Sequence, residues 1–405
     1  GIITKIRKEG GIFMKTNTQK VGFLTLFSIA SVWFGSHAGG GFATGNQATQ
    51  YFVQYGWFST IAAVISMAIL GLVLREIVIM TNNHGFTTYK QVFEELYSPY
   101  IKLELIFELF FFIVAISATG AAIAGAATLF TQYGVNYTAA VIGISILLFF
   151  LTIFGSGLVA KASTIMSICI LVCCAIIFFL GIRAKMENIV SLPQVQPATG
   201  GIVSPMLKVL SYAGFQVLCA PALISCAGPL KNHKNATKCI TIGFIMNAFA
   251  LGASCLMLSS WYGDYTAAGK TDLPTLYICE QLGYKFLSYC YSISLFMCFI
   301  STGVTSIFGL VPRFENTKIF SKFKSEQKKR SFISLTALIV STLVSMIGLT
   351  NIVNYAYVYS GYLSVIFIVI PILTVGYYKN RKFLKEHGAL AREKNKKIFV
   401  KKVRE

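Results

Sequence analysis

Charged residues are scarce in this sequence, and acidic residues are the scarcest. Only 12% of the 405 residues are charged, with 15 Asp and Glu against 35 Lys and Arg, while 55% are hydrophobic. Together with a mean hydropathy of +0.67, this composition lies outside the range of soluble domains. Apolar runs of about 20 residues or more match the thickness of a bilayer. We therefore expect an all-α polytopic membrane protein and not a barrel.

The sequence also lacks the clusters that carry enzyme or metal chemistry. Its ten cysteines fall in or beside apolar runs, without CxxC spacing or a histidine cluster, so we expect them to be packing residues. No Ser/His/Asp set or phosphate-binding loop stands out, and we predict neither enzyme activity nor a cofactor. The net charge of +20 comes from basic residues in the termini and in alternate loops. That distribution indicates membrane topology and not nucleic-acid binding.

Ten apolar segments are long enough to be membrane spans. Lys and Arg collect before the first segment and after the sixth, eighth and tenth, whereas loops 131–137 and 349–355 carry no charge. The positive-inside rule then places both termini in the cytoplasm of a cell-membrane protein. The predicted spans are 21–54, 57–80, 102–130, 136–157, 160–183, 204–228, 236–261, 284–312, 331–349 and 352–378.

The two ends of the chain are basic and are predicted to be cytoplasmic. Residues 1–20 precede the first span, and residues 379–405 form a tail dense in Lys and Arg. The stretch Glu9–Phe13 before Met14 reads like a translated ribosome-binding sequence. We hypothesise that translation starts at Met14 and that residues 1–13 are not native; a genuine basic tail is the alternative.

Residues 34–45, with the sequence FGSHAGGGFATG, interrupt the first apolar segment. Each glycine costs a helix about 1 kcal/mol relative to alanine, so we expect the helix to break here. Inside a bilayer, unwound backbone is tolerated only where it is buried in protein or faces a polar cavity. The stretch therefore predicts a binding site. The alternative is a glycine surface for close helix packing.

Two short amphipathic segments indicate an internal repeat. Residues 88–97 follow the second span and residues 275–284 follow the seventh, so equivalent segments five spans apart lie on opposite sides of the membrane. An inverted repeat has this property. We predict a first repeat at 21–183 and a second at 204–378.

The repeat requires span six to be broken like span one. Ser211, Ala213 and Gly214 supply small residues there, and Pro221 removes one backbone N–H at mid-membrane depth. We expect a second discontinuous helix at this place.

This pattern resembles the leucine-transporter fold of sodium-coupled symporters and of the amino acid–polyamine–organocation superfamily. The residues GGGFATG at 39–45, with Gln47 and the pair Tyr51-Phe52, are more closely similar to YkvI-type bacterial membrane proteins. The resemblance covers residues 20–378 and implies a secondary transporter that works by alternating access.

The resemblance also implies a sodium site. Residues 302–306, TGVTS, are similar to the small-Gly-apolar-Thr-Ser motif that holds a cation in these symporters. Oxygen ligands suit a hard cation, and a helix break frees carbonyls opposite the hydroxyls. The alternative is that these hydroxyls bond to carbonyls of their own preceding turn. Carried over by position, the ligands are the hydroxyls of Thr305 and Ser306 and the carbonyls of Thr302, Gly35 and Ala38.

The predicted substrate is a neutral amino acid or a related small zwitterion. Unpaired N–H groups after the break attract a carboxylate, and neither broken span contains Asp or Glu to neutralise a bare amine. The ammonium group would bond carbonyls near Ser211 and Tyr212, while Phe215 and Gln216 would shape the side-chain pocket. The candidate substrate-binding residues are Ser36, His37, Gly39, Gly40, Gly41, Phe42, Ser211, Tyr212, Phe215 and Gln216.

Two ionisable residues have competing interpretations. His37 lies inside the predicted break, where it either binds substrate or responds to pH, or is a structural hydrogen-bonding residue. Glu108 in span three is a candidate proton site; the alternative is an interfacial ion pair, with Arg75 as a possible partner.

The leading hypothesis is import of a neutral amino acid with one sodium ion. One rival keeps the fold but couples transport to a proton through Glu108 or His37, or works as an exporter or exchanger. Another is a non-transporting membrane receptor or sensor.

Overall fold

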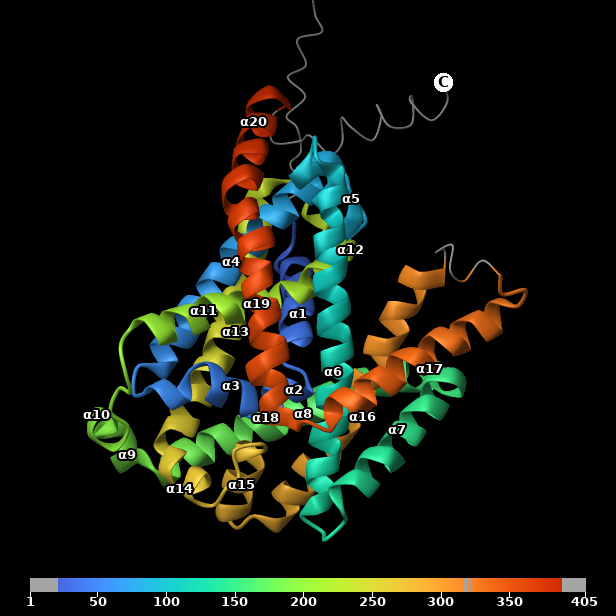
Figure 1. The fold of residues 1–405 in the computed structure, drawn as a ribbon. Coiled ribbons are helices and arrows are strands. Elements are labelled where there is room, and N and C mark those ends of the chain that lie inside the picture. Colours follow the sequence, from blue (N-terminus) through green and yellow to red (C-terminus); the bar gives the residue numbers. More distant parts are fainter. Residues whose placement is uncertain (1–20, 316–319, 321, 388–405) are drawn as a thin grey trace, which may run out of the picture.

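The computed structural model describes residues 21–315, 320 and 322–387, and all of their regular structure is helical (Figure 1). The predictions for residues 1–20, for a start at Met14 and for the tail beyond His387 lie outside this part. Eight helical stretches in the described residues are long and apolar enough to cross a bilayer. They are α4 (Ser59–His84), η2–α6 (Ile101–Thr131), α7 (Tyr137–Phe154), α8 (Ser156–Ala184), α11–α12 (Val203–Cys226), α13 (His233–Ser260), α16 (Lys285–Glu315) and Leu349–His387.

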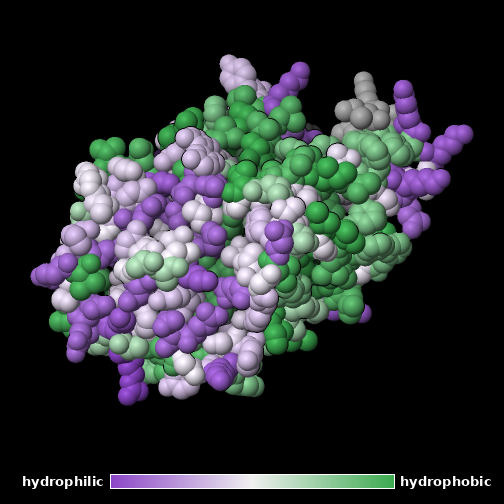
Figure 2. All heavy atoms as spheres, turned by 60° about the horizontal axis from the view of Figure 1, so that its bottom comes forward, coloured by the Kyte–Doolittle hydropathy of each residue, from purple (hydrophilic) through white to green (hydrophobic). Residues whose placement is uncertain are grey.

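The other two predicted spans are also helical but have shorter apolar parts. Span one contributes α1 (Phe23–His37), which ends at the predicted break. Span nine is α17 (Glu326–Ser345), whose first turn and a half, from Glu326 to Arg330, is charged, so its apolar part starts only at Ser331. Hydrophobic side chains cover one flank of the molecule, while hydrophilic ones gather on the end turned forward in Figure 2. A polytopic membrane protein presents such a flank to lipid.

The first span is discontinuous, as predicted. After α1, Ala38 leaves helical geometry and Gly39 is extended, with φ −83° and ψ −165°. The chain resumes as the single turn α2 (Gly40–Ala43) and then α3 (Asn46–Tyr51), with Gly45 between them at φ +78°. Gly45 adopts a left-handed conformation that a residue with a Cβ rarely takes. The short helix η1 (Val53–Tyr55) completes the segment.

The interruption in the sixth span is milder and lies later than the small residues suggested. Helix α11 (Val203–Phe215) passes into a 3₁₀ turn, η3 (Gln216–Cys219), and then into α12 (Ala220–Cys226). Pro221 lies in the first turn of α12, where a missing N–H costs no helical hydrogen bond.

The small residues of span six serve helix packing. A Cβ on Gly214 would overlap the carbonyl oxygen of Gly361 in α19 (Val358–Ser364), and a Cβ on Gly361 would overlap Ser211. The Ser211 hydroxyl donates to the Val358 carbonyl at 2.7 Å. Close backbone contact between α11 and α19 therefore explains these residues.

The last span is one long helical stretch with wider turns. It runs through α18 (Leu349–Asn351), η6 (Ile352–Tyr357), α19, η7 (Val365–Val369), η8 (Ile372–Gly376) and α20 (Tyr377–His387). Helix α20 projects from the same end of the molecule as α5 (Figure 1). The first residues of the predicted basic tail thus continue the helix.

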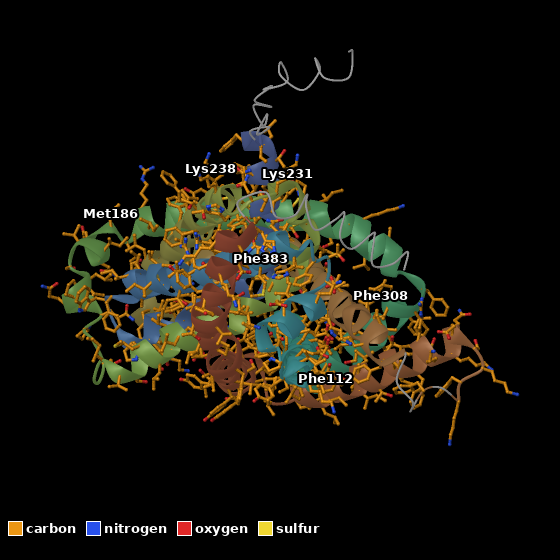
Figure 3. All side chains as sticks on the ribbon, turned by 90° about the horizontal axis from the view of Figure 1, so that it is seen from above. Phe112, Met186, Lys231, Lys238, Phe308 and Phe383 are labelled. Atoms are coloured by element: carbon orange, nitrogen blue, oxygen red, sulfur yellow. The ribbon has the colours of Figure 1, made fainter. Side chains whose placement is uncertain are left out.

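The two short segments at 88–97 and 275–284 are helical and lie at opposite ends of the molecule (Figure 1). They are α5 (Tyr89–Tyr97), which starts with a capping box between Thr88 and Gln91, and α15 (Pro274–Gln281). The α15 end also carries α9 (Met186–Val190), α10 (Leu192–Val195) and α14 (Tyr262–Ala267). In a view from the α20 end, Phe112 of α6 and Phe308 of α16 both lie to one side of Phe383 of α20 (Figure 3). The side chains of Phe112 and Phe308 are 38% and 53% exposed.

Candidate substrate and cation site

A cavity of about 350 Å³ lies beside the break in the first span. Its walls come from the α1–α2 segment, α6, α8, the end of α11 with η3, α16, Gln47 of the helix that follows α2 and Tyr357 of η6. These elements are far apart in the sequence, and the break brings them to one place. The predicted site residues that line it are Gly35, Ser36, His37, Gly39, Gly40, Gly41, Phe42, Phe215, Gln216, Thr302, Thr305 and Ser306.

The cavity wall carries no Asp, Glu, Lys or Arg among the described residues. Its polar groups are hydroxyls, two glutamine amides, one histidine and exposed backbone. Its apolar part combines aromatic and aliphatic side chains, and Phe215 stacks on Tyr357 with ring centroids 4.3 Å apart. Because an isolated charge is costly to bury without a partner, such a wall favours a solute without net charge.

The three consecutive glycines have different roles. A Cβ on Gly39 would meet nothing within 4 Å, so this residue provides the extended backbone of the break beside open space. A Cβ on Gly40 would lie 3.3 Å from the Phe299 ring of α16, which fits the alternative of close helix packing. A Cβ on Gly41 would overlap the amide of Gln47. Close helix packing therefore accounts for Gly40, whereas at Gly39, beside open space, the binding site stays a prediction.

His37, the last residue of α1, has both ring nitrogens bonded to protein. Its Nδ1 lies 2.7 Å from Oδ1 of Asn247 in α13, and its Nε2 lies 2.8 Å from the Tyr212 hydroxyl. The Asn247 amide nitrogen donates to the Gly243 carbonyl, so its oxygen accepts from Nδ1–H of His37. Tyr212 then donates to Nε2. This arrangement ties α1 to α11 and α13 and supports the structural interpretation of His37, although its ring also borders the cavity.

Three of the predicted substrate and cation residues do not line the cavity. Ser211 faces α19, as described above, and Tyr212 lies behind His37 with its ring 4.8 Å from that of Tyr51. Both residues lie within α11, where carbonyls pair along the helix, and the contact of a substrate ammonium with carbonyls near them stays a prediction. Ala38 is 2% exposed and is likewise outside the wall.

The predicted cation ligands on α16 face the break from across the cavity. Thr302, Thr305 and Ser306 line it together with Gly35. The Thr305 hydroxyl donates to the Ser301 carbonyl at 2.7 Å, which is the back-bonding that the alternative predicted. A donating hydroxyl keeps its oxygen lone pairs, so this bond does not prevent cation binding. The described residues contain no group of three or more His, Cys, Asp or Glu placed to hold a metal.

Glu108 forms an ion pair, but with a different partner from the one suggested. Arg313 of α16 donates through Nε to Oε2 of Glu108 at 3.1 Å, and the Tyr89 hydroxyl donates to Oε1 at 2.5 Å. Arg75 instead pairs with Glu76 at 2.5 Å. Burial raises the pKa of Tyr89, and its bond to the Glu108 carboxylate raises it further. Glu108 thus joins α5, α6 and α16.

The cavity opens toward the α5 end of the molecule. Gly35, Ser36 and Thr305, on that side of the break, are exposed, whereas Gly40 and Phe42 on the other side are buried. Beyond them the chain is closely bonded: Tyr291 donates to the Ala43 carbonyl at 2.6 Å, and the Thr275 amide donates to the Thr44 carbonyl at 3.1 Å.

A further layer of hydrogen bonds closes the α15 end. The Asn46 amide donates to the Thr271 carbonyl and to the Thr350 hydroxyl, both at 2.9 Å, and Thr350 donates to Asp272 at 2.5 Å. Asn354 donates to Gln50 at 2.9 Å. These bonds join α3 to the α14–α15 loop and to the start of the last span.

Sequence reasoning missed several wall residues. The sequence did contain a signal for some of them, because serines on α8 and hydroxyl residues on α16 recur every four positions, which places them on one helix face. In the structure these two faces meet, and Ser301 donates to Ser163 at 2.8 Å. Gln47 was noticed only as part of the family resemblance. The missed residues are Gln47, Phe111, Val114, Ala115, Ala118, Ser163, Ser167, Leu218, Cys298, Ser301 and Tyr357.

The fold has counterparts among solved transporters. A Na⁺-coupled sialic acid symporter in a substrate-bound, outward-open state matches with a TM-score of 0.55 at 13% identity, covering 79% of this chain and 72% of that one. The chain has the leucine-transporter fold. Two further proteins with this fold match at similar levels. A mutant of the Eremococcus coleocola manganese transporter has a TM-score of 0.52 at 16% identity, covering 90% and 80%. Inward-facing Mhp1 has a TM-score of 0.51 at 12% identity, covering 82% and 76%.

At the sequence level, the chain is similar to the uncharacterized membrane protein YkvI of Bacillus subtilis (strain 168). The two are 24% identical over 352 residues, which is 84% of this chain and 93% of that protein. This match confirms the resemblance inferred from residues 39–52. No protein-family model matches the sequence.

Proposed function

We propose that this protein is a secondary transporter that moves a neutral amino acid or a related small zwitterion by alternating access, coupled to sodium. The observation that carries the proposal is the uncharged cavity at the helix break. A zwitterion has no net charge, and the backbone groups of a broken helix can pair its two ends. The coarser part, a secondary transporter, is supported by the structural counterparts, which are a sodium-coupled symporter, a manganese transporter and Mhp1, a transporter of the nucleobase-cation-symport-1 family.

Sodium is favoured as the coupling ion by the oxygen groups at the cavity wall. Hydroxyls of Thr305 and Ser306 and backbone carbonyls near Gly35 are ligands that suit a hard monovalent cation. Moving one positive charge inward yields about 2.3 kcal/mol per 100 mV. A tenfold solute gradient costs about 1.4 kcal/mol. One sodium ion per cycle is therefore sufficient for uptake.

Manganese is a less suitable substrate, although one structural counterpart is a manganese transporter. Carboxylate oxygens are among the preferred ligands of Mn²⁺, and the described wall offers none.

Proton coupling through Glu108 is also less well supported. That carboxylate is bonded to Arg313 and Tyr89, and Glu108 is not among the residues that line the cavity. We place both termini and the α5 end in the cytoplasm, which makes this an inward-open conformation.

The test is a thermal-shift screen of the purified protein with amino acids and related zwitterions, in sodium and in potassium. A ligand at 100 times its dissociation constant stabilises the folded state by about 2.7 kcal/mol. We expect a zwitterion to raise the melting temperature more in sodium than in potassium. The double substitution Thr305→Ala and Ser306→Ala should remove this difference and leave the melting temperature in potassium nearly unchanged.

Two outcomes would contradict the proposal. Unchanged sodium dependence in the double variant would refute the cation site. Ligand binding without uptake into proteoliposomes under an inward sodium gradient would favour the rival class, a membrane receptor or sensor on the same scaffold.

A further inference from the structure

The side chain of Gln47 is an unpaired amide in the cavity wall. It belongs to α3 and is only 8% exposed. It lines both the main cavity and an adjoining space of about 30 Å³. Within the described part of the chain its amide has no hydrogen-bond partner. The amide atoms of Gln47 are not sealed inside the protein, because they are not among its fully buried unpaired atoms. An amide that reaches a cavity without a protein partner is available to a ligand group.

Neighbouring polar side chains on α3 are bonded to protein. The Asn46 amide nitrogen donates to Thr350 at 2.9 Å, and the Gln50 oxygen accepts from Asn354 at 2.9 Å. Both contacts are at the closed end of the molecule. Gln47 differs from them because it is directed to the cavity instead.

Gly41 allows this orientation. A side chain at position 41 would overlap the Gln47 amide, so the absence of a Cβ lets the amide lie against the backbone of α2 beside the helix break. The second cavity glutamine, Gln216, is 3% exposed and belongs to the interruption in span six. Each broken helix thus contributes one buried amide to the same cavity, next to the stacked rings of Phe215 and Tyr357.

We propose that Gln47 is a specificity-determining residue that recognises an uncharged amide group on the solute. A primary amide presents two donors and one acceptor, which complement the –CO–NH– edge of another amide. A carboxylate or an ammonium group matches it less well, because each offers only acceptors or only donors. The solute class is then a zwitterionic amino acid with a carboxamide side chain. This inference rests on the proposed function.

The experiment compares L-glutamine, L-asparagine, L-methionine and L-glutamate as ligands of the full-length protein in sodium, with dissociation constants from thermal shift or calorimetry. We expect one of the two carboxamides to bind at least tenfold more tightly than methionine and glutamate. Gln47→Met, which nearly conserves side-chain volume, should reduce this preference at least tenfold and leave methionine affinity within about threefold. Gln50→Met is the matched control, since Gln50 is a buried amide of the same helix outside the cavity; it should keep the preference.

The outcomes separate the two proposals. If all four amino acids bind equally, or if Gln47→Met keeps the preference, Gln47 does not determine specificity and the proposed function stands. If none of the four binds while another zwitterion does, the carboxamide class is wrong. If no zwitterion binds, the proposed function fails and this inference fails with it. Should Gln47→Met not fold, Gln47→Leu, which also removes the amide, is compared with the native protein in its place.

Discussion

The contact between α11 and α19 makes a quantitative prediction for Gly361→Ala. A Cβ at this position would lie 2.9 Å from the Ser211 carbonyl carbon and closer still to the Ser211 oxygens, whereas an ordinary contact begins at 3.4 Å. To restore an ordinary distance between the Cβ and the carbonyl carbon, the two helices must separate by at least 0.5 Å. The backbone atoms of Ser211 cannot rotate out of the way as a flexible side chain can. Overpacking of this kind costs about 1–3 kcal/mol.

The assay is the melting temperature of the purified variant. For chains of 150–250 residues, 1 kcal/mol corresponds to about 2–4 °C, and to less for a longer chain, so we expect a decrease of a few degrees. The matched control is Gly143→Ala in α7, where a Cβ would meet nothing within 4 Å. That substitution should be neutral or stabilise by about 0.4–1 kcal/mol. A Gly361→Ala variant as stable as the control would refute the packing interpretation.

Three further predictions concern the hydrogen bonds around the site and α5. Tyr89→Phe removes the bond to Glu108 and should cost about 1.5–3 kcal/mol at neutral pH. Because the pKa of Tyr89 is raised on folding, the contribution of Tyr89 to stability is complete below about pH 10 and is lost progressively above it. Chemical denaturation should therefore find a smaller difference in unfolding free energy between the variant and the wild type in strong alkali. His37→Phe leaves two buried partners unpaired and should cost on the order of 2–4 kcal/mol while ligand affinity stays the same. A ligand affinity that depends on pH only in the wild type would instead assign His37 a protonation role. Thr88→Ala removes the α5 cap and should lower stability by about 1 kcal/mol, as measured by the same denaturation.

Local sequence was sufficient to predict the break in span one. Three consecutive glycines oppose a helix through the conformational freedom of each residue, so no tertiary information was needed for Gly39. The break in span six was harder to locate. Ser211 and Gly214 are small for a different reason, contact with Gly361, and that partner is about 150 residues away in the sequence.

Pairings between distant residues explain the other misses. Arg75 was the suggested partner in the ion-pair alternative for Glu108, whereas the partner in the structure, Arg313, is 205 positions along the chain. Gln47 looked like an ordinary polar residue in a short helix. Its importance comes from the lack of a protein partner for its amide, and a sequence pattern does not show which side chains lack a hydrogen bond.

The hydrogen bonds that close the α15 end determine how this molecule can change state. In the proposed alternating-access cycle, opening at this end requires Asn46 to leave Thr350 and Thr271, and Tyr291 to leave the Ala43 carbonyl. Each such bond contributes about 0.5–1.5 kcal/mol. Substitutions in this layer are therefore a means of shifting the resting population between the two orientations without altering any residue that touches the solute.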